Sequence, residues 1–165
     1  MTAATHAGRP PYRHGHLAAA RDWSRAIRGH EMPGDGPPSA MTWSFTRADA
    51  RHLRRSLATH VAGRGLSGVR CAEFVLAVHE GVMNVVEHGG GAGRVRLWRA
   101  RHLLCCEISD GGPGIPTQCL DRAGMPGPDG ECGRGLWLMD QLTDTVTVTS
   151  GLQGTVIQIS VRLPA

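Results

Sequence analysis

The sequence contains no lysine: all 18 of its basic residues are arginines, scattered between Arg9 and Arg162. Without lysine, the protein cannot use a lysine nucleophile, a Schiff base or an ammonium group bound to phosphate. This excludes a P-loop, because that motif needs Gly-Lys followed by Ser or Thr. The formal net charge of +4 and the pI near 9.1 fit an anionic partner, but the arginines form no continuous block. We therefore expect no direct contact with nucleic acid.

Cysteine is also scarce. The five cysteines are Cys71, Cys105, Cys106, Cys119 and Cys132, and no two of them have the Cys-x-x-Cys spacing. An odd number without that spacing argues against a disulfide framework and against a zinc site. Cys105 and Cys106 are adjacent in a predicted strand, so their side chains leave opposite faces, and we interpret both as small core hydrophobes. Reduced thiols fit a cytoplasmic protein.

Long apolar runs are absent as well. No stretch reaches the roughly 18 consecutive apolar residues of a membrane span, and the first residues lack a charged segment followed by an apolar one. The sequence gives no sign of a membrane partner.

The 165 residues are enough for one ordinary domain with its own core. Residues 1–40 mix Gly, Pro, His, Arg and Ala without sustained periodicity, and the breaker cluster "EMPGDGPPSA" closes them. We predict a disordered N-terminal arm over 1–40 and a folded domain over 41–165.

Hydrophobic periodicity predicts the elements of that domain. "MTWSFT" alternates as a half-buried strand does. A first helix is predicted over Arg47 to Val61, where Ala50, Leu53, Leu57 and Val61 recur at helical spacing. Ser67 is placed to cap a long second helix, which the glycine run after His88 ends. Two predicted hairpins lie on either side of a long Gly/Pro segment and a short helix over 132–142. The order predicts an α+β fold: a two-layer α/β sandwich with a mixed, mostly antiparallel sheet and helices on one face.

The long predicted helix carries an unusual polar stripe. In "EFVLAVHEGVMNVVEHGG", residues Glu80, Asn84 and His88 are each four positions apart, so their side chains share one face. Phe74 and Val78 belong to a different sector, which gives the helix a separate core face. One face packs, and the other is available for chemistry.

Three further motifs follow, and each also has a purely structural explanation. Asp110 comes after a strand in "SDGGPGIP" and could accept hydrogen bonds from an exocyclic amine, although an Asp-Gly-Gly sequence is often only a turn. "GRGLWLMDQL" places two glycines at a helix start, where free N–H groups can bind phosphate oxygens or where glycine simply lets the loop enter the helix. Thr155, after Gly154, could hold a water beside a base or be an ordinary strand residue.

The ordered set resembles the GHKL ATPase superfamily, which includes gyrase-type ATPases and histidine-kinase catalytic domains. The set comprises Glu80 with Asn84, Asp110-x-Gly112-x-Gly114, Gly133-x-Gly135 and Gly154-Thr155. The resemblance covers about residues 41–163 and implies a Bergerat-type ATP-binding fold. The compact form and the "EGVMNVVEHG" helix look most like the bacterial anti-sigma-factor serine/threonine kinases.

The resemblance implies ATP and Mg²⁺ as cofactors and a role for each position. Asn84 would bind Mg²⁺, and Glu80 would act as general base. Asp110 would recognise adenine, with Gly112 and Gly114 shaping its pocket. The other implied ligand contacts are Gly133, Gly135, Arg134, Thr155 and His88. Structural alternatives stay open for three of them: Glu80 as a solvated helix residue, Arg134 as an exposed loop residue and His88 as a helix-terminal cap.

By the same resemblance, the function is an ATP-dependent protein serine/threonine kinase. Its substrate would be a small anti-sigma-factor antagonist, with a sigma factor as second partner and a possible homodimer. A histidine kinase needs a dimerisation helix hairpin, for which residues 1–40 are too short and too rich in Gly and Pro. The alternative is a non-catalytic, nucleotide-sensing module that binds a partner. Glu87 is a departure, because a carboxylate near phosphate would weaken ATP binding unless it points away.

Overall fold

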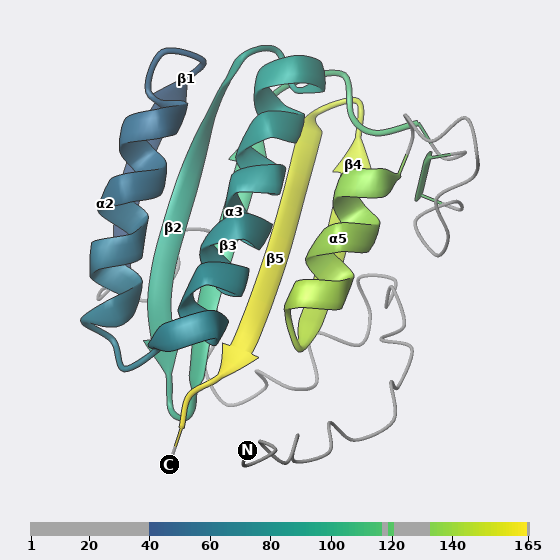
Figure 1. Ribbon diagram of the computed structural model, residues 1–165. Helices are drawn as coiled ribbons and strands as arrows, with labels where there is room; N and C mark the ends of the chain where they lie inside the picture. The colour runs from purple at the N-terminus through teal and green to yellow at the C-terminus, as the bar shows by residue number, and fades with distance from the viewer. Residues whose placement is uncertain (1–39, 117–118, 121–132, 165) are drawn as a thin grey trace, which may run out of the picture.

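The structure, a computed structural model, describes residues 40–116, 119–120 and 133–164 (Figure 1). Their elements, in chain order, are β1 (Met41–Thr46), α2 (Ala50–Ala62), α3 (Gly68–His88), β2 (Ala92–Ala100), β3 (Leu103–Asp110), α5 (Arg134–Leu142), β4 (Thr145–Gly151) and β5 (Gly154–Arg162). The predicted arm lies outside this part of the chain except at its last residue. The domain boundary near residue 41 therefore stays a prediction.

The five strands form one sheet in the order β1-β2-β3-β5-β4, and all four pairings are antiparallel. The three described helices lie side by side over one face (Figure 1). This is the predicted α+β arrangement. β5 pairs with both β3 and β4. Because β3 and β5 are antiparallel, the start of β5 lies beside the end of β3.

The core lies between the helices and the sheet. Its largest fully buried side chains include Phe74 of α3, Leu57 of α2, Ile108 of β3 and Met139 of α5. Burying a side chain of this size contributes roughly 1.5–3 kcal/mol, so this face of the helices fixes their position on the sheet. Among the described residues, no helix is long and apolar enough to cross a bilayer.

The first helix begins three residues later than the predicted start at Arg47. Asp49 occupies the position before it, and its Oδ2 accepts hydrogen bonds from the backbone N–H and the hydroxyl of Thr46, at 2.9 and 2.8 Å. These bonds stabilise a turn that delays the helix and hold the pKa of Asp49 below its ordinary value. Ser67 does occupy the N-cap position of α3, but its hydroxyl makes no capping bond, so that part of the prediction was wrong.

Cys105 and Cys106 are both buried, as predicted for core residues on opposite faces of β3. Cys106 belongs to the main core, whereas Cys105 is buried outside it, opposite Trp98 of β2 in the strand register. Burial raises the pKa of Cys105 to about 11, and burial also raises that of Cys106. Neither thiol is a nucleophile near neutral pH.

Candidate nucleotide site

The polar stripe of α3 lies beside α5. Gly81, on the same side of the helix, is buried so closely against Ile108 and Met139 that a Cβ there would lie 3.1 Å from Ile108 Cδ1. This close packing brings the next residues of the stripe toward the start of α5. Asn84 is half-buried, while the His88 side chain, at the helix end, is 72% exposed.

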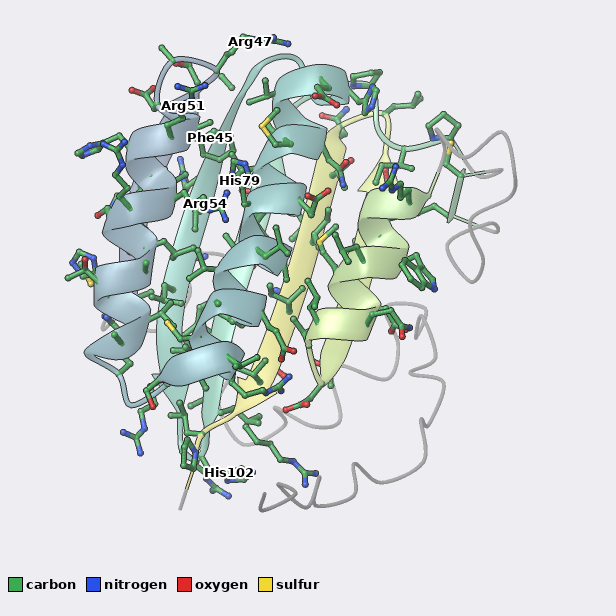
Figure 2. The ribbon with its side chains drawn as sticks, in the orientation of Figure 1. Phe45, Arg47, Arg51, Arg54, His79 and His102 are labelled. Atoms are coloured by element: carbon green, nitrogen blue, oxygen red, sulfur yellow. The ribbon has the colours of Figure 1, made fainter. Side chains whose placement is uncertain are left out.

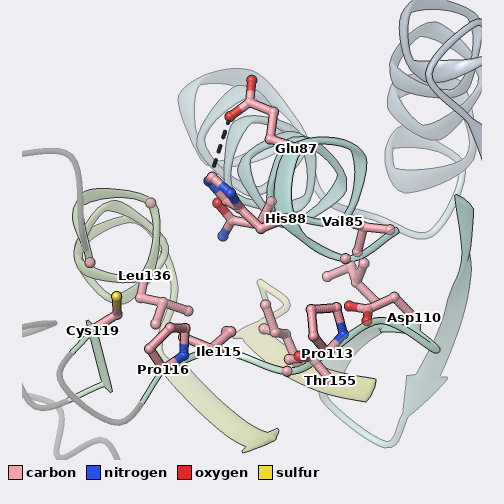
Figure 3. A pocket seen from close by; sticks show the side chains of 17 residues that line it. Val85, Glu87, His88, Asp110, Pro113, Ile115, Pro116, Cys119, Leu136 and Thr155 are labelled. Atoms are coloured by element: carbon pink, nitrogen blue, oxygen red, sulfur yellow. Dashed lines mark ion pairs between the residues drawn. The ribbon is translucent and has the colours of Figure 1, made fainter. Parts of the chain in front are cut away.

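A cavity of about 590 Å³ opens where α3 ends, β3 and β5 meet and α5 begins. Figure 3 shows Glu87 and His88 above it on α3, with Asp110, Pro113 and Thr155 below and Ile115, Pro116, Cys119 and Leu136 along the other side. The remaining lining residues are Asn84, Val85, Gly89, Ile108, Gly114, Gly133, Gly135 and Ile157. The site therefore combines apolar walls with a few polar groups, as ligand cavities usually do.

Asp110 and Thr155 lie at one end of this cavity and are direct partners in the pairing of β3 with β5. One carboxylate oxygen of Asp110, Oδ1, accepts a hydrogen bond from the Gly112 N–H at 2.8 Å. That bond fixes the orientation of the carboxylate. The other oxygen, Oδ2, has no hydrogen bond to another described residue and is available to a donor in the cavity.

Gly112 allows the loop after β3 to touch the end of α3. A Cβ at this position would lie 2.5 Å from the backbone carbon of Gly89 and 2.6 Å from its oxygen, distances that real side chains do not adopt. The neighbouring Gly111 has nothing within 4 Å of the same hypothetical atom. The loop after β3 therefore packs directly on the end of α3 at Gly112, a position that only glycine allows.

At the opposite end, α5 begins at the cavity with no side-chain cap. Gly133 precedes it in the left-handed conformation, with φ of 88°, and no side chain of the described residues caps the first-turn N–H groups. A Cβ at Gly135 would lie 3.1 Å from the side-chain oxygen of Asn84, so the amide of α3 faces the start of α5. Free N–H groups and the positive end of a helix dipole favour an anion at such a place.

The structure brings most, but not all, of the predicted residues to the cavity. Those that line it are Asn84, His88, Asp110, Gly114, Gly133, Gly135 and Thr155. Glu80, Gly112 and Arg134 do not line it. Glu80 is half-buried one turn before Asn84, and Arg134 is exposed on the first turn of α5. Gly112 packs against the backbone of Gly89 and does not face the cavity.

Several lining residues were not predicted from the sequence. The apolar walls come from Val85, Ile108, Leu136 and Ile157, which look like ordinary core residues in sequence because they continue the core periodicity of their elements. Glu87 is at the rim and mostly exposed, with Oε2 4.0 Å from His88 Nε2. The sequence had marked Glu87 as a carboxylate near the phosphates, but not as part of the cavity lining.

Cys119 corrects the expectation of uniformly reduced thiols. It is disulfide-bonded and lines the cavity, while Cys71, Cys105 and Cys106 are free. The bonding partner lies outside the described residues, as does most of the Gly/Pro segment that precedes α5. An odd cysteine count argues against a network of disulfides but does not exclude a single bond.

Comparison with solved structures supports the fold. The RsbU and RsbW domains of Rv1364c from Mycobacterium tuberculosis match with a TM-score of 0.57 and 20% identity, over 77% of this chain. This chain spans only 32% of that protein. The mycobacterial sensor histidine kinase MprB matches at 21% identity with a TM-score of 0.46, over 76% of this chain and 100% of that one.

The histidine kinase domain of the E. coli osmosensor EnvZ matches at 17% identity with a TM-score of 0.45, covering 83% of this chain and 93% of that one. At such identities the matches describe the fold alone. Comparison with curated proteins gives no match.

The sequence itself matches a family profile over residues 44–161, a range that begins in β1 and ends in β5 and so includes every element around the cavity. That match covers well over half of the chain. The protein belongs to the histidine kinase-like ATPase domain family.

Proposed function

We propose that the cavity binds ATP, with the base at the Asp110 end and the phosphates at the start of α5. The observation that carries this assignment is the placement of an oriented carboxylate and a free helix start at opposite ends of one apolar cavity. The family implies nucleotide binding in general. The polar groups at the two ends of the cavity set the orientation in which the nucleotide binds.

At the base end, Oδ2 of Asp110 accepts a hydrogen bond from the exocyclic amine of adenine. Ile108 and Ile157 lie on the neighbouring strands and line the same cavity, so they contact the flat ring. A donor that faces the carboxylate is required, because Asp110 is half-buried and an acceptor that the bound base covers costs about 1–3 kcal/mol if it stays unpaired. A purine with a carbonyl in place of the amine would be rejected.

At the phosphate end, the N–H groups around Gly133 and Gly135 bind phosphate oxygens, and Arg134 neutralises their charge. Asn84 is the protein ligand that fits Mg²⁺, since its side-chain amide lies at this end and supplies an oxygen, the atom that hard cations bind. Within the described ranges, no three His, Cys, Asp or Glu residues could hold a metal by themselves. Mg²⁺, when bound, would neutralise phosphate charge.

We assign the chemistry to a protein serine/threonine kinase with Glu80 as general base. Glu80 lies outside the cavity, one turn before Asn84, so it would meet a hydroxyl approaching from solvent. The hydroxyl oxygen forms a bond to the γ-phosphorus while the bond from that phosphorus to the β-γ bridging oxygen breaks. The hydroxyl proton passes to Glu80, and ADP leaves.

The proposed substrate is a small anti-sigma-factor antagonist, and a sigma factor is the proposed second partner, with a homodimer as the assembly. These assignments rest on the motif resemblance. One of the structural matches contains an RsbW domain, which fits the same regulatory class without identifying a partner for this chain.

A second candidate function is a nucleotide-sensing module that binds its partner without catalysis. The position of Glu80 favours this candidate, because the carboxylate is not part of the cavity wall. The two functions share the ATP site and differ in whether the γ-phosphoryl group leaves.

The deciding experiment measures transfer from radiolabelled ATP to a candidate antagonist, together with ATP affinity. For a kinase, Glu80→Gln lowers transfer by about 100-fold or more while ATP affinity changes little, because a general base contributes roughly 10²–10⁴. Glu73→Gln is the matched control two turns earlier on α3 and keeps full transfer. If the unaltered protein binds ATP but transfers and hydrolyses nothing, the binding-module function is correct.

A further inference from the structure

Ser150 on β4 lies behind the base end of the cavity and is not part of its lining. It is the direct partner of Thr155 in the pairing of β4 with β5, and Thr155 is the partner of Asp110 across β3 and β5. The three residues thus form one row across three strands. The side-chain oxygens of Ser150 and Thr155 are 3.1 Å apart.

The same Ser150 hydroxyl also holds the loop after β3. Its oxygen accepts a hydrogen bond from the backbone N–H of Ile115 at 2.6 Å. At the neighbouring position Gly114, with φ of 83°, a Cβ would lie 2.5 Å from the carbonyl oxygen of Gly151. The loop therefore rests directly on the end of the β4–β5 hairpin, and Ile115 is held in the cavity wall by Ser150.

Ser150 and Thr155 each carry one hydroxyl proton, and either hydroxyl could donate to the other. The surroundings of each hydroxyl indicate which one donates. If Thr155 donated to Ser150, the Ser150 proton would have no acceptor recorded among the described residues, at a position outside the cavity. If Ser150 donates to Thr155, the Thr155 proton is the remaining one, and Thr155 borders the cavity. A ligand or a water can then accept it, so the second arrangement pairs the Ser150 proton within the protein and leaves the Thr155 proton for the cavity.

We propose that Ser150 is a positioning residue for the purine: by donating to Thr155, it makes the Thr155 hydroxyl a donor toward the ligand. Beside it, Asp110 is an acceptor. An acceptor next to a donor matches an amine next to an unprotonated ring nitrogen, as in adenine, with Thr155 donating directly or through one water. In guanine, the carbonyl would face the carboxylate. This inference rests on the proposed ATP site and adds the residue that sets its base preference.

The test compares equilibrium affinities for ATP, 1-deaza-ATP and 7-deaza-ATP, in which carbon replaces one ring nitrogen next to the amine. The unaltered protein should bind ATP about tenfold more tightly than the analogue that lacks the contacted nitrogen. Ser150→Ala should reduce this ratio to between one and about two, because Thr155 is no longer held as a donor. Ser150→Thr keeps a hydroxyl and should restore the ratio.

A merely structural role would weaken all three nucleotides equally and leave the ratio unchanged, which overturns the inference. Ser150→Cys, a near-isosteric weak donor, provides the same comparison if the alanine variant does not fold. An unaltered protein that binds ATP but discriminates against neither analogue also overturns it while the ATP site stands. An unaltered protein that binds no nucleotide rejects the proposed function as well.

Discussion

The two ends of the helix–sheet sandwich are built in different ways. At the cavity end, the bonds of Asp110 and Ser150 stay within the sheet and the loop after β3, and the one described ion pair, between Glu87 and His88, stays within α3. The end of α3 meets the loop after β3 through the contact of the Gly112 and Gly89 backbones. At the other end, Arg70 of α3 donates to the carbonyl oxygen of Leu142 and to the carboxylates of Glu73 and Asp144.

Asp144 extends that second arrangement, because its Oδ2 accepts a hydrogen bond from the Arg162 N–H at 2.7 Å. Polar side chains therefore join α3 to the segment after α5 at one end, whereas at the cavity end α3 meets the loop after β3 through glycine backbone. The difference teaches that side-chain bonds anchor α3 at the end far from the cavity, while close backbone packing positions its cavity end. Two predictions test this division, and a third concerns the middle of α3.

The largest effect should come from the glycine contact at the cavity end. Gly112→Ala places a methyl group within 2.5 Å of the Gly89 backbone, so the loop after β3 must move and the Asp110 carboxylate loses its N–H donor. We expect ATP affinity to fall by roughly 100-fold, since hydrogen bonding and cavity shape at the base are lost together. Titration with ATP measures the change.

Gly111→Ala is the matched control, because the added methyl meets nothing within 4 Å. It should bind ATP within about twofold of the unaltered protein. Equal losses in the two variants would show that the loop needs flexibility at both positions, and the close contact at Gly112 would then have no special role.

A smaller effect on stability alone should come from the other end. Arg70→Met removes bonds of 3.1, 3.2 and 2.9 Å, but the Arg70 side chain is 39% exposed and solvent screens its charge. We expect a loss of about 1 kcal/mol in the free energy of unfolding and a fall of about 3 °C in Tm. ATP affinity should stay unchanged.

Arg51→Met serves as the comparison, since Arg51 is exposed and makes no recorded bond to another described residue. It should leave Tm within about 1 °C. If Arg70→Met instead weakened ATP binding, the two ends would be coupled and the division between them would fail.

The smallest effect concerns His79, on the side of α3 that faces α2, where Figure 2 shows it near Arg54. Burial and the charge of Arg54 lower its pKa, while Glu80 opposes the shift. The unfolded chain therefore takes up a proton below about pH 6.5, before the folded protein does, and stability falls as pH decreases through that window. His79→Gln should remove this part of the pH dependence.

Denaturant unfolding at several pH values between 5 and 8 measures the effect. The unaltered protein and His79→Gln should differ in slope below pH 6.5 and run parallel above it. Parallel curves over the whole range would mean that His79 titrates equally in both states, and the pH dependence would have another origin.

Much of the fold was predictable because the sequence repeats its core pattern element by element. Phe74, Val78 and Val82 define the buried face of α3, and the alternation of "TVTVTS" defines β4. Boundaries were less certain where a side chain competed with the backbone, as at Asp49, whose bonds to Thr46 delay α2. The disulfide at Cys119 left no clear signal, since cysteine spacing does not record which thiols meet in space.

The site was predictable to the extent that its residues lie in short motifs. Asn84, Asp110 and Gly133 could be named from sequence because local spacing fixes their elements. Ser150 could not, because its partners, Ile115 and Thr155, come from a different loop and a different strand. Nor could spacing show that Glu80 stays outside the cavity while Asn84 lines it.

By itself, the sequence determined which residues are polar on an apolar helix, which turns require glycine and which strands alternate, because these depend on local periodicity. Only the tertiary structure decided that Asp110, Thr155 and Ser150 form one row, since three strands must pair in register to align them. It also decided that Gly112 touches Gly89, because that contact exists only when the loop after β3 packs on the end of α3.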